Sequence, residues 1–338
     1  MSDKEIEVKH VVVHILAKEQ HGAATIELSP NESDLTQASQ RLINDICGKY
    51  AGKAGKGYGH FENDSDNYPM SSMVEEYTSG NSDFHGSSCR MMNHLLERTS
   101  DQQLATGGYV LFSHVEIDRH DYLLVAIVNA TTGSAITREF AIQDSVYLDI
   151  AKLRVAGRID LTSLSNGAER YISFLKGQNS VSTYFKKFLG CNDVLIARRE
   201  SEKLRKALKE FATEQGLSEE TRESFLESAY DHLKALSKND QPLSIEILAN
   251  AIWPADPAIL TSKLADENLE LSDGFVPDGR VIRGLVTYKG KSQHWELKFD
   301  RAGIVDGSVE YNQERNEIVL RNIPDKFRDE LIKEVIGE

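Results

Sequence analysis

The stretch YVLFSHVEIDRHDYLLVAIV, residues 109–128, decides the fold of this chain. Residues 109–115 and 122–128 form two nearly continuous apolar runs, and a run without polar alternation is typical of a strand buried on both faces. The six residues between them, EIDRHD, suit a hairpin connection. We therefore expect two antiparallel strands in a sheet that is covered on both sides.

The residues around this hairpin predict a mixed domain. Residues 8–16 are rich in β-branched side chains and predict a strand, whereas Leu35, Ala38 and Leu42 recur at helical spacing. Further strands are expected at residues 24–28, 146–150, 154–161 and 170–175, and helices at residues 33–50 and 87–98. The predicted fold class is α+β, with helices and a mostly antiparallel sheet in the N-terminal domain.

The pattern changes to helices after residue 175. Tyr184, Phe185 and Phe188 lie on one stripe of an amphipathic helix that Gly190 would end. Helices are then expected at residues 193–211, 218–236, 244–252 and 257–267, strands at 281–288, 293–299 and 317–320, and a closing helix at 324–336. We expect three domains: an α+β domain at residues 1–190, a helical segment at 191–270 and a small α+β domain at 271–338.

The composition indicates a globular cytosolic protein. The 338 residues are 40% hydrophobic and 27% charged, and no apolar run approaches the ~20 residues that cross a membrane. The N-terminus, MSDKEIEVKH, lacks the apolar core of a signal peptide. Cys47, Cys89 and Cys191 form no CxxC pair, which disfavours a structural zinc site. We expect reduced thiols, no bound metal and no cofactor.

The charge of the chain is segregated. The formal net charge is −14, yet residues 152–209 hold thirteen Lys or Arg against five Asp or Glu. The remainder holds 26 basic and 48 acidic residues. The acidic balance argues against a protein that coats nucleic acid with its whole surface. The local basic excess favours a restricted interaction surface.

This basic cluster is the strongest functional signal in the sequence. Most charge runs are only the solvated face of a helix, but this cluster opposes the net sign of the chain and spans several expected elements. Lys and Arg side chains bind phosphate by releasing counterions and need no base-specific geometry. The candidate DNA-binding residues are Arg154, Arg158, Arg170, Lys176, Lys186, Lys187, Arg198, Arg199, Lys203, Arg205, Lys206 and Lys209.

Two other groups of residues suggest chemistry less strongly. Residues 51–59, AGKAGKGYG, predict a glycine-rich loop, but they lack the GxxxxGK-Ser/Thr pattern of a phosphate-binding P-loop. Glu116, Asp118 and Asp121 could bind Mg²⁺ for phosphodiester cleavage. Their position between two apolar strands favours a solvated turn instead. We assign no catalytic residue.

Several stretches together resemble a known protein family. They are GGYVLFSHVEIDRHDYLLVAIVN (107–129), YLDI (147–150), RVAGRIDLT (154–162), RYISFLKG (170–177) and YFKKFLG (184–190). Their order and spacing, with the mass of 37.8 kDa, resemble the bacterial 37-kDa nucleoid-associated protein family of the NdpA or YejK type. The resemblance implies association with the nucleoid in the cytoplasm, with DNA binding as the activity. It carries over no catalytic residues.

These observations lead to one hypothesis and two alternatives. The hypothesis is a non-enzymatic, nucleoid-associated protein that contacts DNA phosphates through a basic face with little sequence selectivity. It allows a homo-oligomer, in which paired sites raise the effective concentration, and contacts with other nucleoid proteins. The first alternative is a protein-interaction module whose basic face docks an acidic nucleoid partner. The second is a metal-dependent nuclease built on Glu116, Asp118 and Asp121.

Overall fold

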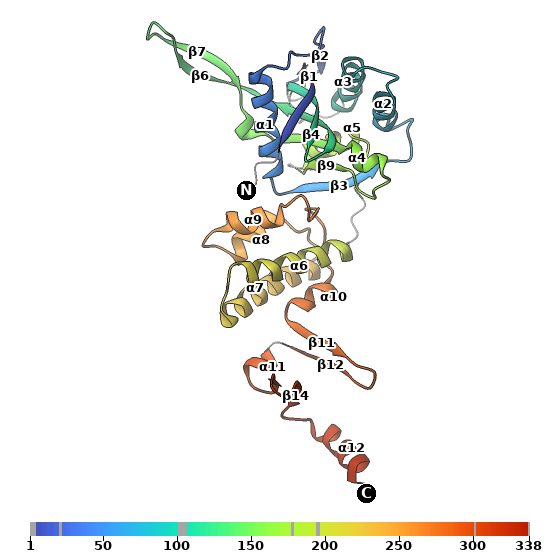
Figure 1. Cartoon of the computed structure of the whole chain (residues 1–338), viewed down its shortest axis with the longest axis vertical. Coiled ribbons are helices and arrows are strands. Elements are labelled where there is room, and N and C mark those ends of the chain that lie inside the picture. Colours follow the sequence, from blue (N-terminus) through green and yellow to red (C-terminus); the bar gives the residue numbers. More distant parts are fainter. Residues whose placement is uncertain are drawn as a thin grey trace.

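The chain has an N-terminal sheet part, a helical middle part and an extended C-terminal tail (Figure 1). The structure is a computed structural model that describes residues 5–19, 22–100, 107–176, 179–193, 197–300 and 302–336. No helix within these residues is long and apolar enough to cross a membrane. The α+β fold class predicted from the sequence is confirmed.

An eight-stranded antiparallel sheet forms the N-terminal part. Its strands, in spatial order, are β10 (Cys191–Asn192), β3 (Lys56–Phe61), β9 (Ile172–Leu175), β8 (Val155–Asp160), β5 (His120–Val128), β4 (Gly108–Ile117), β1 (Ile6–Ala17) and β2 (Thr25–Glu27). Strands β4 and β5 meet in a two-residue turn, Asp118 and Arg119, where φ is 51° and 68°. Left-handed backbone at both positions is the type I′ turn, whose twist matches that of the flanking strands.

Helices cover both faces of this sheet. Helix α1 (Gln37–Ala51) lies on one face, and α2 (Met70–Thr78), α3 (Phe84–Ser100) and α5 (Asn179–Phe188) lie on the other. Because side chains alternate along a strand, β4 and β5 supply both cores. Leu111, Leu124 and Ala126 pack toward α1, whereas Phe112, Leu123 and Val125 pack toward the other helices. This double coverage explains the continuous apolar runs and confirms the expectation for residues 109–128.

The middle part is a helical layer with its own core. Its helices are α6 (Ala197–Glu214), α7 (Glu219–Lys238), α8 (Ile245–Ile252), α9 (Pro257–Leu264) and α10 (Gly279–Ile282), followed by the 3₁₀ turn η2 (Arg283–Leu285). Phe211, Phe225 and Trp253 meet at its centre, and the indole stands edge-on to both phenyl rings at 5.3 and 5.6 Å between centroids. Aromatic rings prefer edge-to-face contacts of this kind over a face-to-face sandwich, and the contacts add to the stabilisation that burial provides.

The remaining elements lie at the periphery. The ribbon β6 (Ala130–Ile136) and β7 (Ile142–Leu148) extends from the sheet part and is followed by the short helix η1 (Ile150–Lys152). The short helix α4 (Leu161–Ser165) follows β8 at the opposite end of β5. The tail holds two hairpins and two helices (Figure 1): β11 (Thr287–Lys291) with β12 (Glu296–Asp300), α11 (Ala302–Val305), β13 (Val309–Asn312) with β14 (Glu317–Leu320), and α12 (Asp325–Ile336).

Some predicted elements are wrong in detail. The expected loop at residues 51–59 gives way to strand β3 from Lys56, because residues 56–59 pair with β9 and their glycines fit where neighbouring groups approach closely. A Cβ on Gly59 would stand 2.1 Å from the Asn192 carbonyl oxygen. The expected strand at 281–288 is helical to Leu285, because Asp278 caps α10 through the backbone N–H of Arg280 and Val281. Part of the helix expected from residue 193 falls on residues 194–196, outside the described ones. The domain boundaries at 190 and 270 stay predictions.

The buried His14 gives a prediction about acid stability. Burial, and then the neighbouring His85, lowers the pKa of His14 to about 4. Its ring bonds the Ser29 N–H and the Ser88 hydroxyl at 3.0 Å each. Between pH 6.5 and 4 the unfolded chain binds a proton that the folded chain rejects, so stability falls as the pH falls.

We expect His14→Asn to flatten this pH dependence, measured by urea denaturation from pH 7 to 4. The exposed His294 offers the matched control, because His294→Asn should leave the slope unchanged. An unaltered slope in His14→Asn would contradict the assignment.

Candidate nucleic-acid interface

The structure divides the twelve basic candidates into three groups. The first group is buried or half-buried and holds Arg158, Arg170, Lys176 and Lys186. The second is exposed on the sheet part and holds Arg154 and Lys187. The third lies on α6 and holds Arg198, Arg199, Lys203, Arg205, Lys206 and Lys209. The sequence neighbours therefore do not share one continuous surface.

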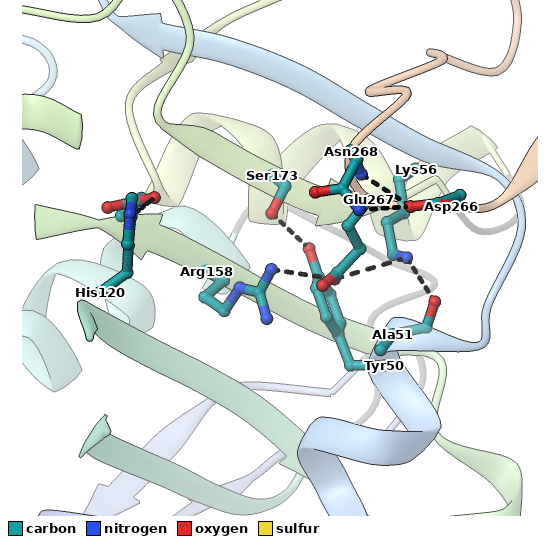
Figure 2. Close-up of polar contacts among 10 residues, drawn as sticks. Tyr50, Ala51, Lys56, His120, Arg158, Ser173, Asp266, Glu267 and Asn268 are labelled. Carbon is teal, nitrogen blue, oxygen red and sulfur yellow. Dashed lines mark hydrogen bonds and ion pairs between the residues drawn. The ribbon is translucent and has the colours of Figure 1, made fainter. Parts of the chain in front are cut away.

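Arg158 of β8 is a structural residue at the junction between the sheet and the helical layer. Its Nη2 lies 2.9 Å from Oε1 of Glu267, and its guanidinium stacks over the ring of Tyr122 at 4.4 Å. Figure 2 shows Arg158 and Lys56 both reaching toward Glu267, while His120 lies apart. Burial opposes the charge of Arg158, but the Glu267 carboxylate outweighs it and raises the pKa of the guanidinium above its ordinary value.

Lys56 of β3 shares the same carboxylate. Its Nζ is 3.7 Å from Oε1 of Glu267 and donates to the backbone carbonyl of Ala51 at 2.8 Å. The side chain is only 2% exposed, and burial lowers its pKa to about 8 although Glu267 acts in the opposite direction. A lysine held here is therefore close to losing its charge in mildly alkaline solution.

A second buried pair joins the sheet part to α6. Nη1 of Arg170 lies 2.8 Å from Oε1 of Glu200, a fully buried residue, in an ion pair without hydrogen-bond geometry. The other Glu200 oxygen accepts the backbone N–H of Ser272 at 2.8 Å. The pair thus fixes α6 and the segment at residues 266–273, which we call the junction loop, against the sheet.

Lysines complete the attachment of the junction loop. Lys176 donates to the carbonyl of Asp273 at 2.9 Å, and Lys203 donates to the carbonyl of Glu270 at 3.0 Å. Lys186 pairs with Asp193, which also lies 3.4 Å from Lys176. These cations hold two parts of the chain together, and Arg158 and Arg170 are too deeply buried to meet a nucleic-acid backbone.

A polar pocket of about 400 Å³ lies at this junction. Its walls include the Arg158 and Arg170 guanidiniums, but also four carboxylates, from Asp118, Asp160, Glu267 and Glu270. The carboxylates outnumber the guanidiniums, and each guanidinium already has a carboxylate partner. The pocket is therefore unfavourable for phosphate.

The α6 face forms a different kind of site. A groove of about 900 Å³, which we call the α6 groove, is lined by Arg199, Glu202, Lys203, Arg205, Lys206, Lys209, Glu210, Arg280, Arg283, Gly284, Thr287 and Lys298. Eight of these residues are basic and two are acidic. Arg199 pairs with Glu169 at 2.5 Å and Lys206 with Glu210 at 3.7 Å. Exposed ion pairs of this kind contribute little to stability. The groove therefore keeps an excess of positive charge.

Three cations of the α6 groove were missed from the sequence. Arg280, Arg283 and Lys298 come from α10, η2 and β12, far along the chain from α6. Arg280 and Arg283 have the three-residue spacing of one helix face, a signal hidden by the strand prediction for residues 281–288. The Arg205 side chain crosses directly above Gly284, where a Cβ would stand 2.7 Å from its Nη1.

The carboxylates of the proposed nuclease site are engaged by a lysine. Nζ of Lys9 lies 2.8 Å from Glu116 and 2.6 Å from Asp121, which also contacts Nε2 of His114 at 2.9 Å. The Lys9 ammonium thus occupies the position that a divalent cation would need between these oxygens. Within the described ranges, no group of three His, Cys, Asp or Glu side chains could hold a metal ion.

The junction gives a prediction about stability. Glu267→Ala leaves Arg158 and Lys56 buried without their carboxylate, and we expect the free energy of unfolding to fall by about 3–5 kcal/mol. Urea denaturation measures the change. Glu214→Ala is the control, because Glu214 pairs with Lys263 at 2.6 Å near the surface and should cost at most about 1 kcal/mol. Equal losses in both variants would contradict a structural role for Glu267.

Comparisons with known proteins agree with the resemblance noted in the sequence. Residues 12–328 match the family described as nucleoid-associated protein YejK. Nucleoid-associated proteins of Azotobacter vinelandii and Pseudomonas aeruginosa are each 28% identical, over 98% of this chain and 99% of their own length. One from Pseudomonas syringae is 28% identical over 96% of this chain and 98% of its length. With the match extending over nearly all of its residues, the chain belongs to the YejK family of nucleoid-associated proteins.

Proposed function

We propose that this protein binds the phosphate backbone of nucleoid DNA through the α6 groove, with little sequence selectivity and without catalysing a reaction. The observation that carries the proposal is a groove lined by eight basic and two acidic residues in a chain of net charge −14. The groove is positively charged although the chain as a whole is negative, so it attracts a polyanion to this part of the surface. The relatives' printed names support the nucleoid as the location, within the cytoplasm.

The groove suits phosphate better than base edges. Its cations are long side chains from four elements, and several are exposed and able to reach successive phosphates. Contacts of this kind set the position of a protein on DNA but carry no sequence information. Counterion release then supplies most of the binding free energy, so affinity depends strongly on salt.

A neighbouring acidic groove would restrict how DNA lies on the protein. A hollow of about 980 Å³ on α7 and β12 is lined by six carboxylates and three cations, two of which, Arg283 and Lys298, also line the α6 groove. The carboxylates belong to Glu220, Glu223, Glu227, Asp231, Asp300 and Asp306. These carboxylates repel phosphate, so a DNA backbone bound to the protein would stay on the α6 side of Arg283 and Lys298.

The proposal predicts a salt-dependent loss of affinity on removal of groove charges. A chain carrying Lys206→Gln, Arg280→Gln, Arg283→Gln and Lys298→Gln loses four exposed cations of the groove. We expect weaker binding to every duplex sequence. The slope of log Kd against log salt should also be smaller by about 0.9 for each phosphate that the variant no longer neutralises. Fluorescence anisotropy with labelled duplexes between low and moderate salt measures both quantities.

A matched control removes four exposed cations outside the groove: Arg41, Lys49, Lys152 and Lys326, each to Gln. This control variant changes the net charge by the same amount, and its slope of log Kd against log salt should stay close to that of the wild type. If the two quadruple variants lose affinity equally, the groove has no special role. If the groove variant binds as the wild type does, the site is misplaced.

The absence of catalysis is tested separately. Supercoiled plasmid incubated with the protein and Mg²⁺ or Mn²⁺ should stay intact, because Lys9 neutralises the carboxylates of Glu116 and Asp121. Nicking is followed by agarose gel electrophoresis. Cleavage that disappears in Asp118→Asn or Asp121→Asn would sink this part of the proposal.

A further inference from the structure

The polar pocket at the junction has walls from two different parts of the chain. One wall is a face of the sheet, where the register places Arg158 opposite Ser173 and Asp160 opposite Tyr122. The other wall is the junction loop, which contributes the Asn268 amide and two carboxylates. A hollow of about 400 Å³ between two layers, with a few polar groups that converge on it, is the usual setting of a small-molecule site.

Two deeply buried arginines keep unused N–H donors at this pocket. The side chains of Arg158 and Arg170, which both line it, are only 9% and 6% exposed. Within the described ranges, Arg158 donates to Glu267 alone, and its Nε has no partner. Arg170 donates to none of these residues, and its contact with Glu200 lacks hydrogen-bond geometry. A guanidinium has five N–H donors, and unpaired donors in a buried site are costly, so the pocket favours a ligand that supplies oxygen acceptors.

The positive end of the pocket lies around Arg158. Arg158 and Lys56 share the one carboxylate of Glu267, which leaves an excess of one positive charge. Lys56 stays mostly protonated at neutral pH, because burial lowers its pKa only to about 8. A carboxylate from a ligand would balance this group, and a guanidinium can bind a carboxylate through two parallel hydrogen bonds.

The negative end lies at Asp160, two residues further along the same strand. Residues at this spacing share a face, so the Cα atoms of Arg158 and Asp160 lie about 7 Å apart. Ser163 donates its N–H and its hydroxyl to the Asp160 carboxylate, and the His120 ring lies 3.2 Å from it. No Lys or Arg in the described parts of the chain pairs with this carboxylate. Figure 2 shows His120 apart from Arg158, so the two ends are separate.

We infer that the junction pocket binds a free α-amino acid, with its carboxylate on Arg158 and Arg170 and its ammonium on Asp160. A zwitterion has no net charge, so the surplus of carboxylates that disfavours phosphate does not repel it. Tyr171 and Ile172 also line the pocket and favour an apolar side chain on the ligand. The bound amino acid would contact both the sheet and the junction loop. The inference stands independently of what the α6 groove binds.

The test is calorimetric titration of the full chain, without DNA, at pH 7.5 with L-leucine, L-methionine and L-phenylalanine. We expect at least one of them to bind with a Kd in or below the millimolar range and to raise the melting temperature. The matched probes for leucine are 4-methylpentanoate, which lacks the ammonium, and 3-methylbutylamine, which lacks the carboxylate. The corresponding probes for the other two amino acids lack the same groups. Each probe should bind about tenfold more weakly than its amino acid or worse, because one charged hydrogen-bonded contact is lost.

A variant of the negative end tests the assigned residue. Asp160→Asn keeps an acceptor for Ser163 but removes the charge, and we expect a loss of about tenfold or more in amino-acid affinity. The control is Asp64→Asn, because the exposed Asp64 likewise accepts a backbone N–H three residues ahead, from Asn67, and lies outside the pocket. This control should bind as the wild type does.

Three results would overturn the inference. The first is a wild-type chain that binds none of the three amino acids. The second is a wild-type chain that binds the carboxylate or amine probes as tightly as the amino acid. The third is an Asp160→Asn chain that keeps native helix content by circular dichroism and wild-type affinity. The first two results need no variant, so they decide the question even where Asp160→Asn does not fold.

Discussion

The junction between the sheet and the helical layer rests on buried ion pairs, and the rest of the architecture depends on them. Arg158 and Lys56 meet Glu267, and Arg170 meets Glu200, all with little access to water. Removing such charges from water is costly, and the cost is offset only when each charge has its partner in place. Few alternative dockings of the two layers would satisfy all of these groups, so the network selects one arrangement.

Helix α6 connects this junction to the candidate interface. Its inward side buries Glu200 and Ser201, and the Ser201 hydroxyl accepts the backbone N–H of Asp278 at 2.8 Å. That contact sets the start of α10, which carries Arg280 and leads to Arg283. Its outward side supplies Lys206 and Lys209 to the groove. The position of the cationic side chains therefore follows from contacts made on the opposite side of the same helix.

The sequence predicted the fold better than the site. Continuous apolar runs at β4 and β5 predicted strands covered on both sides, because burial on two faces leaves a direct trace in hydrophobicity. The sequence did not indicate which of the twelve basic residues are buried and which are exposed. A cation paired with a buried carboxylate and a cation facing solvent have the same signature in the sequence. Glu267, Arg283 and Lys298 could not be connected with the cluster, since only the packing of distant segments brings them together.

Gly284 leaves room for the Arg205 side chain to lie close to the backbone. The Arg205 guanidinium lies over it at a distance that leaves no room for a methyl group. The chain turns at this point from the helical layer into the β11–β12 hairpin. Any side chain here would have to displace the flexible end of Arg205, so the missing Cβ at residue 284 is what lets this guanidinium lie against the backbone at the rim of the α6 groove.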